Sequence, residues 1–463
     1  MTCDCEHIHK GACVTETRTE PTTSGPATGR PKVLVVGAGF GGLALARSLA
    51  DTPADVIVLD RTNHHLFQPL LYQVATAQLA PTDIAYPVRG VLRRVPNASF
   101  RAATVTDLDW QAREIATADG ARFAFDHLVL AAGARTASFG VDLAHAETLK
   151  TVDDALALRQ RLLTAFERAQ AEPELVEAGA LDVVVVGGGP TGVELAGAVS
   201  ELYRNVLARD FPDLPVHRAQ ISLVELDDGP LAGFHPQLRA YTAAQLRRRG
   251  VQLHFGRRGT EAGPDRVTLD DGLRLRVGTT VWAAGVEAQP LATALGLPTG
   301  GGGRVAVDAD LSVPGYPGVW AIGDVAAARD GDGALLPQLA PVAQQAGRHV
   351  ASQIARAVHG EPTEAFAYRD KGAMATIGRR AAVAQAFGGR VRLRGTLGWL
   401  AWLWLHLAML IGFRNRASVL LDWAWTYLGC ERGGRLLVRR DADPAGDQHP
   451  DPVAEKAQKA ASG

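Results

Sequence analysis

Two glycine-rich segments in this chain have the spacing of a dinucleotide-binding turn. Gly37, Gly39 and Gly42 follow the apolar run 33–36, and Gly187, Gly189 and Gly192 follow the apolar run 183–186. In such a turn the first glycine permits a sharp bend, the second lets the backbone approach a pyrophosphate, and the third lets a helix pack closely on the strand. We therefore expect phosphate groups to bind at two helix N-termini. The other residues assigned to these turns are Phe40, Gly41, Pro190 and Thr191.

An acidic residue ends the apolar segment that follows each turn. Asp60 comes 18 residues after Gly42, and Glu225 comes 33 residues after Gly192. An acid at this point accepts hydrogen bonds from a ribose 2′-hydroxyl. It also repels a 2′-phosphate, so Glu225, with no arginine next to it, predicts NADH rather than NADPH at the second site. Because the usual spacing is about 20 residues, we expect an extended helix and loop over 191–220.

Three later strands end in small or acidic residues that could close over a cofactor. The strand 128–130 leads to Ala132 and Gly133, and the strand 281–283 leads to Gly285. A third strand, 319–322, ends in Gly323 and Asp324 just before a helix. Repeated strand, turn and helix units predict an α/β protein with two Rossmann-like domains. Two dinucleotides in one chain are typical of electron transfer between a nicotinamide and a flavin.

Composition narrows the route by which electrons could leave a flavin. The chain has 463 residues and a net charge of −1, which allows two or three domains and gives no electrostatic indication of nucleic-acid binding. Its four cysteines are Cys3, Cys5, Cys13 and Cys430, so the segment 14–429 holds no redox dithiol and no iron–sulfur ligand set. The acceptor is therefore a small molecule or a partner protein. The Cys- and His-containing segment 3–13 lacks zinc-site spacing and is expected to be a flexible tail, with metal binding as a minor alternative.

The segment 397–428 is apolar and rich in tryptophan. Its first part, 397–413, has no polar face and is shorter than the about 20 residues of a spanning helix. In its second part Ser418, Asp422 and Thr426 stand four apart and predict the polar stripe of an amphipathic helix. Tryptophan and arginine at the ends of apolar helices are typical of a membrane interface, so we expect contact with a membrane surface. A tryptophan-rich core or dimer interface is the alternative.

Taken together, these features resemble the type II NADH:quinone oxidoreductases, which are single-subunit NADH dehydrogenases. The resemblance runs from about residue 32 to residue 440. The segments that carry it, beyond the two turns, are NHHLFQPLLYQVAT at 63–76, GVELAGA at 192–198, YRDKG at 368–372, ATIGR at 375–379 and GFRNR at 412–416.

The resemblance implies FAD at the first site, with Asp324 as a contact, and NADH at the second. It also implies a quinone acceptor (menaquinone or ubiquinone), no proton pumping, and peripheral attachment at the cytoplasmic face of the inner membrane. A homodimer is expected.

Three residues receive roles from the resemblance. Glu194 is placed near the contact between nicotinamide and flavin and is linked to quinone reduction and its protons. Lys371 is placed near the quinone end of the flavin. Gln345 matches the second glutamine of the quinone-site pattern, whereas Pro341 replaces the first and removes a side-chain amide. Two alternatives therefore stay open: a soluble NADH-dependent reductase of a ferredoxin- or rubredoxin-type protein, and a redox-sensing flavoprotein of low turnover.

The order of these segments predicts how the chain divides into domains, with the glycine run 300–303 marking the return from the inserted domain. We expect disordered tails over 1–30 and 441–463, an FAD-binding domain split between 31–150 and 303–370, an inserted NADH-binding domain over 151–302, and a C-terminal amphipathic helical, membrane-associating region over 371–440.

Overall fold

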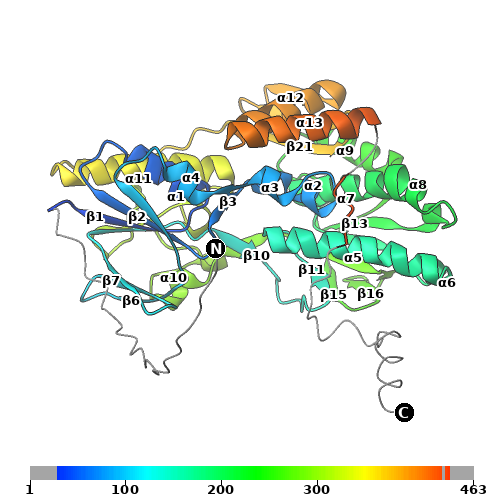
Figure 1. Ribbon diagram of the computed structural model, residues 1–463, viewed down its shortest axis with the longest axis horizontal. Helices are drawn as coiled ribbons and strands as arrows, with labels where there is room; N and C mark the ends of the chain where they lie inside the picture. Colours follow the sequence, from blue (N-terminus) through cyan, green and yellow to red (C-terminus); the bar gives the residue numbers. More distant parts are fainter. Residues whose placement is uncertain (1–28, 430–432, 438–463) are drawn as a thin grey trace, which may run out of the picture.

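The computed structural model describes residues 29–429 and 433–437 (Figure 1). The predictions for the C-terminal tail and for the segment 3–13 lie outside the described residues, as does nearly all of the predicted N-terminal tail.

The first glycine turn belongs to a parallel sheet of five strands in the order β20-β9-β1-β2-β5. Its strands are β1 (Lys32–Val36), β2 (Asp55–Asp60), β5 (Ala98–Ala102), β9 (His127–Leu130) and β20 (Val319–Ala321). The valine- and leucine-rich strands β1 and β9 are buried on both faces, as in parallel sheets covered by helices. The helices α1 (Phe40–Ser48) and α11 (Ala340–Val358) pack closely, because a Cβ at Gly347 would lie 2.3 Å from the Gly41 carbonyl oxygen.

The second glycine turn belongs to another parallel sheet of five strands, in the order β11-β18-β12-β13-β14. Its strands are β11 (Ala146–Glu147), β12 (Val183–Val186), β13 (Ile221–Glu225), β14 (Val251–Phe255) and β18 (Thr279–Trp282). The main helices of this part are α5 (Val152–Ala171), α7 (Pro190–Leu202) and α9 (Pro236–Arg248). After α7 the chain continues through a π-helical turn (Tyr203–Leu207), α8 (Ala208–Asp210) and a 3-10 turn (Val216–Arg218), so the expected extended connection is present.

The part of the chain that contains the two parallel sheets also has four small antiparallel sheets and several short helices. The sheets are β3 (His64–Leu66) with β4 (Ala85–Pro87), β6 (Val105–Asp109) with β7 (Glu114–Thr117) and β8 (Arg122–Ala124), β10 (Ala134–Thr136) with β19 (Val286–Ala288), and β15 (Gly259–Ala262) with β16 (Arg266–Leu269) and β17 (Arg274–Arg276). The short helices are 68–70, α2 (Leu71–Ala75), α3 (Pro81–Ile84), α4 (Val88–Leu92), α6 (Glu174–Glu177), α10 (Leu291–Ala294), 301–303 and 323–325.

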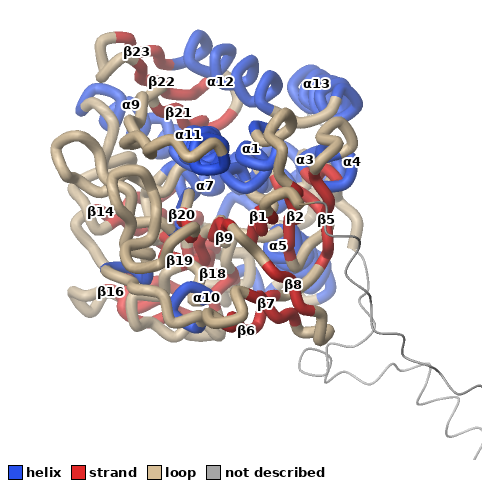
Figure 2. The backbone as a smooth tube through the Cα atoms, turned by 90° about the vertical axis from the view of Figure 1, so that its left-hand side faces the viewer, coloured by secondary structure: helices blue, strands red, loops and turns tan. Residues whose placement is uncertain are grey.

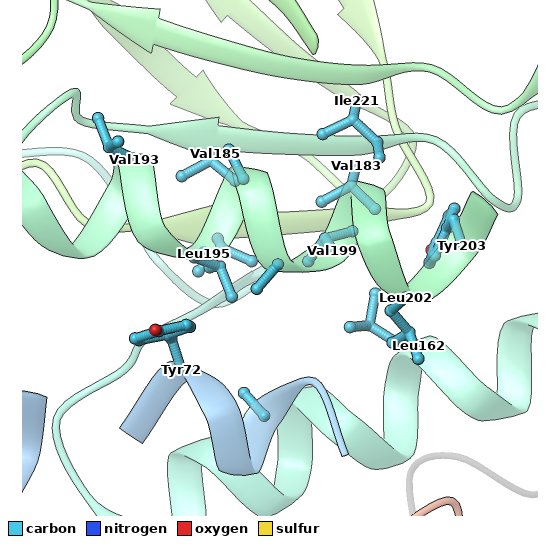
Figure 3. Packing of buried hydrophobic residues seen from close by; sticks show 14 of the residues in the cluster. Tyr72, Leu162, Val183, Val185, Val193, Leu195, Val199, Leu202, Tyr203 and Ile221 are labelled. Atoms are coloured by element: carbon cyan, nitrogen blue, oxygen red, sulfur yellow. The ribbon is translucent and has the colours of Figure 1, made fainter. Parts of the chain in front are cut away.

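The C-terminal region consists of an antiparallel sheet and two helices. These are β21 (Ala373–Gly378), β22 (Ala381–Ala386), β23 (Val391–Arg394), α12 (Gly395–Met409) and α13 (Phe413–Gly429). They lie together along one side of the molecule, at the top of both Figure 1 and Figure 2. A single buried cluster joins side chains of α2, α5, α7, β21, α12 and α13, and Figure 3 shows Tyr72 of α2 beside Leu195 of α7 within it. This region therefore shares a core with the second nucleotide-binding part.

The two apolar helices depart from their expected limits. The predicted run 397–413 ends at Met409, because Gly412 adopts a φ of +91° and the next helix begins at Phe413. Among the described residues, the structure has no helix that is both long enough and apolar enough to cross a membrane.

The five tryptophans of α12 and α13 differ in how far they are exposed. Trp399, Trp402 and Trp423 are buried within the protein, whereas Trp404 and Trp425 are 71% and 68% exposed. The alternative of a tryptophan-rich core therefore holds for the first three, and the other two remain available to the expected membrane contact.

The polar stripe of α13 faces the protein body. The Ser418 hydroxyl donates to Asp83 Oδ1 of α3 at 2.7 Å, and the side chain of Asp422 interacts with the same carboxyl group. Leu420 and Leu421 are exposed instead. The predicted polar stripe is present, but the apolar residues of α13 divide: Val419 and Trp423 are buried within the protein, whereas Leu420, Leu421 and Trp425 face outward.

Candidate functional site

The first glycine turn is held by backbone contacts that exclude side chains. Gly37 has a φ of +115°, and a Cβ there would lie 2.2 Å from the Ala131 carbonyl oxygen. A Cβ at Gly42 would lie 1.9 Å from the Gly37 carbonyl oxygen. Gly39, by contrast, faces open space at the N-terminus of α1, where no side chain caps the helix. The free N–H groups of this helix end fit a pyrophosphate.

The other residues predicted for this site follow neighbouring strands of the same sheet. Asp60 ends β2, Ala132 and Gly133 follow β9, and Gly323 and Asp324 follow β20. Because the strands are parallel, their carboxyl ends meet at one edge, which is where open α/β sheets bind ligands.

The carboxyl groups at this edge are held in place. Asp60 accepts hydrogen bonds from the Ala38 N–H at 2.7 Å and from the Thr62 N–H at 2.8 Å. Burial raises the pKa of Asp324, while Lys150 and Arg304 act in the opposite direction. The arrangement of an open helix end, an acid at the end of β2 and a nearby cation fits FAD. Sequence motifs gave no indication of Lys150, which lies within reach of Asp324 only in the folded chain.

The second glycine turn repeats the geometry of the first. Gly187 has a φ of +113°, and a Cβ there would lie 2.3 Å from the Ala283 carbonyl oxygen. Gly189 faces open space at the uncapped N-terminus of α7, followed by the exposed Pro190 and Thr191. On the neighbouring β18 side, Gly285 adopts a φ of +155° beside the Phe139 ring.

Glu225 stands beside this turn at the end of β13. Its carboxylate accepts the N–H groups of Gly188 and of Asp227, the latter at 2.9 Å. The backbone of Arg257 approaches Glu225, but the Arg257 guanidinium pairs with Asp271. The chain thus presents a carboxylate where a 2′-phosphate would need a cation, which fits NADH better than NADPH.

Glu194 lies one turn further along α7 and is buried against the C-terminal region. The Thr376 N–H of β21 donates to Glu194 Oε1 at 3.3 Å. Burial raises the pKa of Glu194 to about 8, although the Thr376 N–H and the Trp402 indole favour its charged form. The Trp402 Nε1 lies outside hydrogen-bond geometry, so we count it as a nearby dipole rather than as a bond. Near neutral pH this carboxyl group can hold a proton.

A small pocket of about 10 Å³ lies beside Glu194, roughly the room that one water needs. It is lined by side chains of α2, α7, β21 and α13, including Tyr72, Glu201 and Tyr427. Tyr72 accepts a hydrogen bond from Gln73 Nε2 at 2.8 Å, and Gln73 Oε1 accepts one from the Trp423 indole at 2.8 Å. Tyr72 and Gln73 lie in the segment 63–76, but nothing in the sequence predicts that they connect α7 with α13.

Gln345 and Lys371 occupy the segment that leads to β21. Gln345 is bonded at both ends of its amide to the Arg369 backbone, at 3.0 Å each. It therefore holds the chain two residues before the exposed Lys371. Pro341 lies in the first turn of α11, where a missing N–H costs no helical hydrogen bond. Five residues after Lys371 the chain reaches Thr376, which donates to Glu194.

Two protein-family models match the chain, one over the part with the two parallel sheets and one over the C-terminal region. The family model "Pyridine nucleotide-disulphide oxidoreductase" matches residues 31–347, and the model "NDH2 C-terminal domain" matches residues 371–431. The first of these families is FAD-dependent and uses NAD(P)H. Its name refers to a disulphide, but residues 14–429 contain no cysteine.

Similar folds occur among solved structures. The NDH2 of Plasmodium falciparum, solved in complex with NADH, matches with a TM-score of 0.80 at 18% identity, covering 89% of this chain and all of that one. The sulfide:quinone oxidoreductase of Aquifex aeolicus matches with a TM-score of 0.65 at 17% identity, covering 90% of this chain and all of that one. At these identities the likeness concerns the fold.

Two relatives are more similar in sequence to this chain than these solved structures are. A type II NADH:quinone oxidoreductase of Mycobacterium tuberculosis, Ndh, is 38% identical over 441 residues, covering 91% of this chain and 93% of the relative. A second one from the same organism, NdhA, is 36% identical and covers 90% of this chain and 91% of the relative. The chain belongs to the type II NADH:quinone oxidoreductase family.

Proposed function

We propose that this protein is an NADH dehydrogenase that passes two electrons from NADH through FAD to a membrane quinone without pumping protons. The observation that carries the proposal is the contact between Glu194 on the helix of the second glycine turn and Thr376 of the C-terminal region. It joins a nucleotide-binding helix to the part of the chain that matches the NDH2 C-terminal domain. When bound, FAD supplies hydride acceptance and two-electron donation.

The residues of the chain supply binding, orientation and a proton in this proposal. The turns at Gly37–Gly42 and Gly187–Gly192 bind the two pyrophosphates through backbone N–H groups. Asp60 and Glu225 accept hydrogen bonds from the ribose hydroxyl groups. Glu194 holds a proton for the quinone on its buried carboxyl group. Gln345 positions the segment that carries Lys371, and Lys371 offers a cation to the acceptor or to the flavin.

The domain division belongs to the same proposal. The sheet that contains β20 supports an FAD-binding domain made from 31–150 and 303–370, because β20 pairs with β9 across the intervening segment. The second sheet supports an NADH-binding domain over 151–302, because four of its five strands lie there, whereas the short strand β11 precedes residue 151. The C-terminal region 371–440 follows as a third part.

We further propose that the outer side of α12 and α13 attaches the protein to the cytoplasmic face of the inner membrane. Large apolar side chains are exposed there: Leu397, Leu400, Trp404, Phe413, Leu420, Leu421 and Trp425. Several large exposed apolar side chains on two neighbouring helices are typical of a surface that contacts a membrane or another protein. A homodimer that covers part of this face is compatible with the same exposure.

The first test is anaerobic stopped-flow reoxidation of the NADH-reduced flavin by short-chain menaquinone and ubiquinone analogues. Reoxidation on the timescale of steady-state turnover is expected. Fast reduction by NADH followed by slow reoxidation with both quinones would contradict the proposal and favour a ferredoxin- or rubredoxin-type acceptor. Slow steps in both directions would favour a redox sensor.

A further inference from the structure

Glu194 and Glu201 stand on the same side of α7 with a small residue between them. Positions 194, 198 and 201 are spaced by four and three residues, which places their side chains in one row on a helix. The backbone positions of the two residues are about 10 Å apart along the helix axis, at 1.5 Å per residue, and both side chains reach the pocket between them. Glu194 is 8% exposed, whereas the Glu201 side chain is 17% exposed. The row therefore runs from a buried acid towards the surface.

The pocket beside Glu194 lies along this row. It is lined by Glu194, Ala198 and Glu201 and by groups from three other elements: Tyr72, Thr376 and Tyr427. A side chain longer than that of alanine at position 198 would extend into it. The pocket has room for about one water, and its walls carry the two to four polar partners that a buried water needs.

Glu201 lies at the more exposed end of this pocket, beside two arginines. Its Oε1 accepts the Arg379 N–H at 2.6 Å and lies 3.6 Å from the Arg249 guanidinium. On the opposite side Glu194 is covered by the fully buried Trp402 and by β21. The titratable or charged groups that face the row from other elements are Tyr72 of α2, Arg249 at the end of α9, Arg379 after β21 and Tyr427 of α13.

We propose that this pocket is the path by which a proton from bulk water reaches Glu194, with Glu201 at its entrance and a water between the two carboxyl groups. The inference rests on the proposed function, in which NADH, one proton and a quinone give NAD⁺ and a quinol. In each turnover Glu194 gives its proton to the quinone and becomes a carboxylate. It then takes a proton from the pocket water, the water takes one in turn from the Glu201 carboxyl group, and Glu201 is reprotonated from solvent, so that the water is regenerated.

Two substitutions test the path by different means. Glu201→Gln removes the titratable group but keeps an oxygen that can accept the Arg379 N–H. Ala198→Leu fills the pocket and leaves every titratable group in place. Glu177→Gln is the matched control, because it removes a carboxylate that pairs with Arg218 at an exposed site in the same part of the chain. FAD content and the thermal midpoint establish that each variant is folded.

Quinone-dependent reoxidation of the reduced flavin is the measurement, made with oxygen excluded in H₂O and in D₂O. We expect flavin reduction by NADH to be unchanged in all three variants. Reoxidation should slow by about 10²-fold in Glu201→Gln and Ala198→Leu, at the lower end of what positioned proton transfer contributes, with a larger solvent isotope effect. Imidazole should restore part of the rate in Glu201→Gln by delivering protons in its place, and Glu177→Gln should match the wild type.

The possible failures are distinguishable. If the wild type itself is not reoxidised by quinone, the proposed function is overturned before the variants are compared. If the wild type is normal and both path variants keep its reoxidation rate and isotope effect, the proton path is overturned and the proposed function stands.

Discussion

At the scale of single residues, the buried carboxyl of Glu194 gives the proposed reaction its pH dependence. Because burial raises its pKa to about 8, the group is mainly protonated at neutral pH and loses its proton as the pH rises through that value. Quinone-dependent reoxidation should therefore fall between about pH 7 and pH 9. Glu194→Gln should be slower by 10²-fold or more, in line with the loss of about 10²–10⁴ from a general acid, and should lose this pH dependence. Stopped-flow reoxidation across this pH range is the test, with flavin reduction by NADH as the internal control. A Gln variant that keeps the wild-type profile would show that another group titrates.

Asp422 provides a second residue-scale prediction, concerning stability. Burial raises the pKa of Asp422, and the charge of Asp83 and their hydrogen bond act in the same direction. An acid whose pKa is raised by folding favours the folded state only while it is protonated. Its stabilising contribution is therefore lost as the pH rises from the ordinary value of 3.8 through the raised value. Asp422→Asn should raise the thermal midpoint at pH 7.5 and have less effect at pH 4. The exposed Asp51→Asn serves as the control, and equal shifts at both pH values would contradict the electrostatic explanation.

At the scale of elements, the closest approach near the proposed site is between α7 and β21. A Cβ at Gly197 would lie 2.1 Å from the Ile377 carbonyl oxygen, a backbone atom that cannot turn aside. Gly197→Ala should push the helix from the strand, weaken the Thr376–Glu194 hydrogen bond and destabilise the protein by about 1–3 kcal/mol, as overpacking does. Denaturant unfolding measures the loss. Gly233→Ala, where a Cβ meets open space, is the matched control, and an equal midpoint in the two variants would contradict this packing.

Whether a feature could be predicted from the sequence depends on how far apart in the chain its residues lie. A glycine turn depends on residues within one strand–helix unit, so Gly37 and Gly187 could be interpreted from local spacing alone. The direction of the α13 polar stripe depends on Asp83, 335 residues away from Ser418, and no local pattern carries that information. Gln345 is an intermediate case. Its position in a motif suggested a site residue, but only the fold shows its amide bonded to the Arg369 backbone.

At the scale of the whole molecule, the proposed electron transfer begins at the glycine turns, where the nucleotides bind, and ends near the apolar helices, where the quinone binds. In the proposed function the carboxyl edges of the two parallel sheets bind the nucleotides, while α12 and α13 share a buried cluster with α7 and β21 (Figure 1). Glu194 lies on α7, the helix that follows the second glycine turn, and accepts the Thr376 N–H of the C-terminal region. The glycine turns and the apolar helices could be predicted from the sequence, but the connection through Tyr72, Gln73 and Trp423 required two segments that are distant in the chain to meet.

The final prediction concerns the attachment of the whole molecule to a membrane. Trp404 and Trp425 are the two tryptophans of α12 and α13 that the protein leaves exposed. Each indole could remove on the order of 150 Å² from water at an interface, at most about 4 kcal/mol. The double variant Trp404→Ser/Trp425→Ser should bind vesicles at least about tenfold more weakly, which needs only about 1.4 kcal/mol.

Flotation with liposomes of bacterial lipids measures this binding, and sedimentation gives the oligomeric state of the same samples. Leu273→Ser replaces an exposed leucine between β16 and β17 and should float like the wild type, because β16 lies at the bottom of Figure 1 and α12 and α13 lie at the top. If the tryptophan variant floats normally but changes from dimer to monomer, the exposed face of α12 and α13 is an interface between copies rather than a membrane contact. Loss of flotation with an unchanged oligomeric state would assign the face to lipid, because the same two indoles cannot be covered by both partners at once.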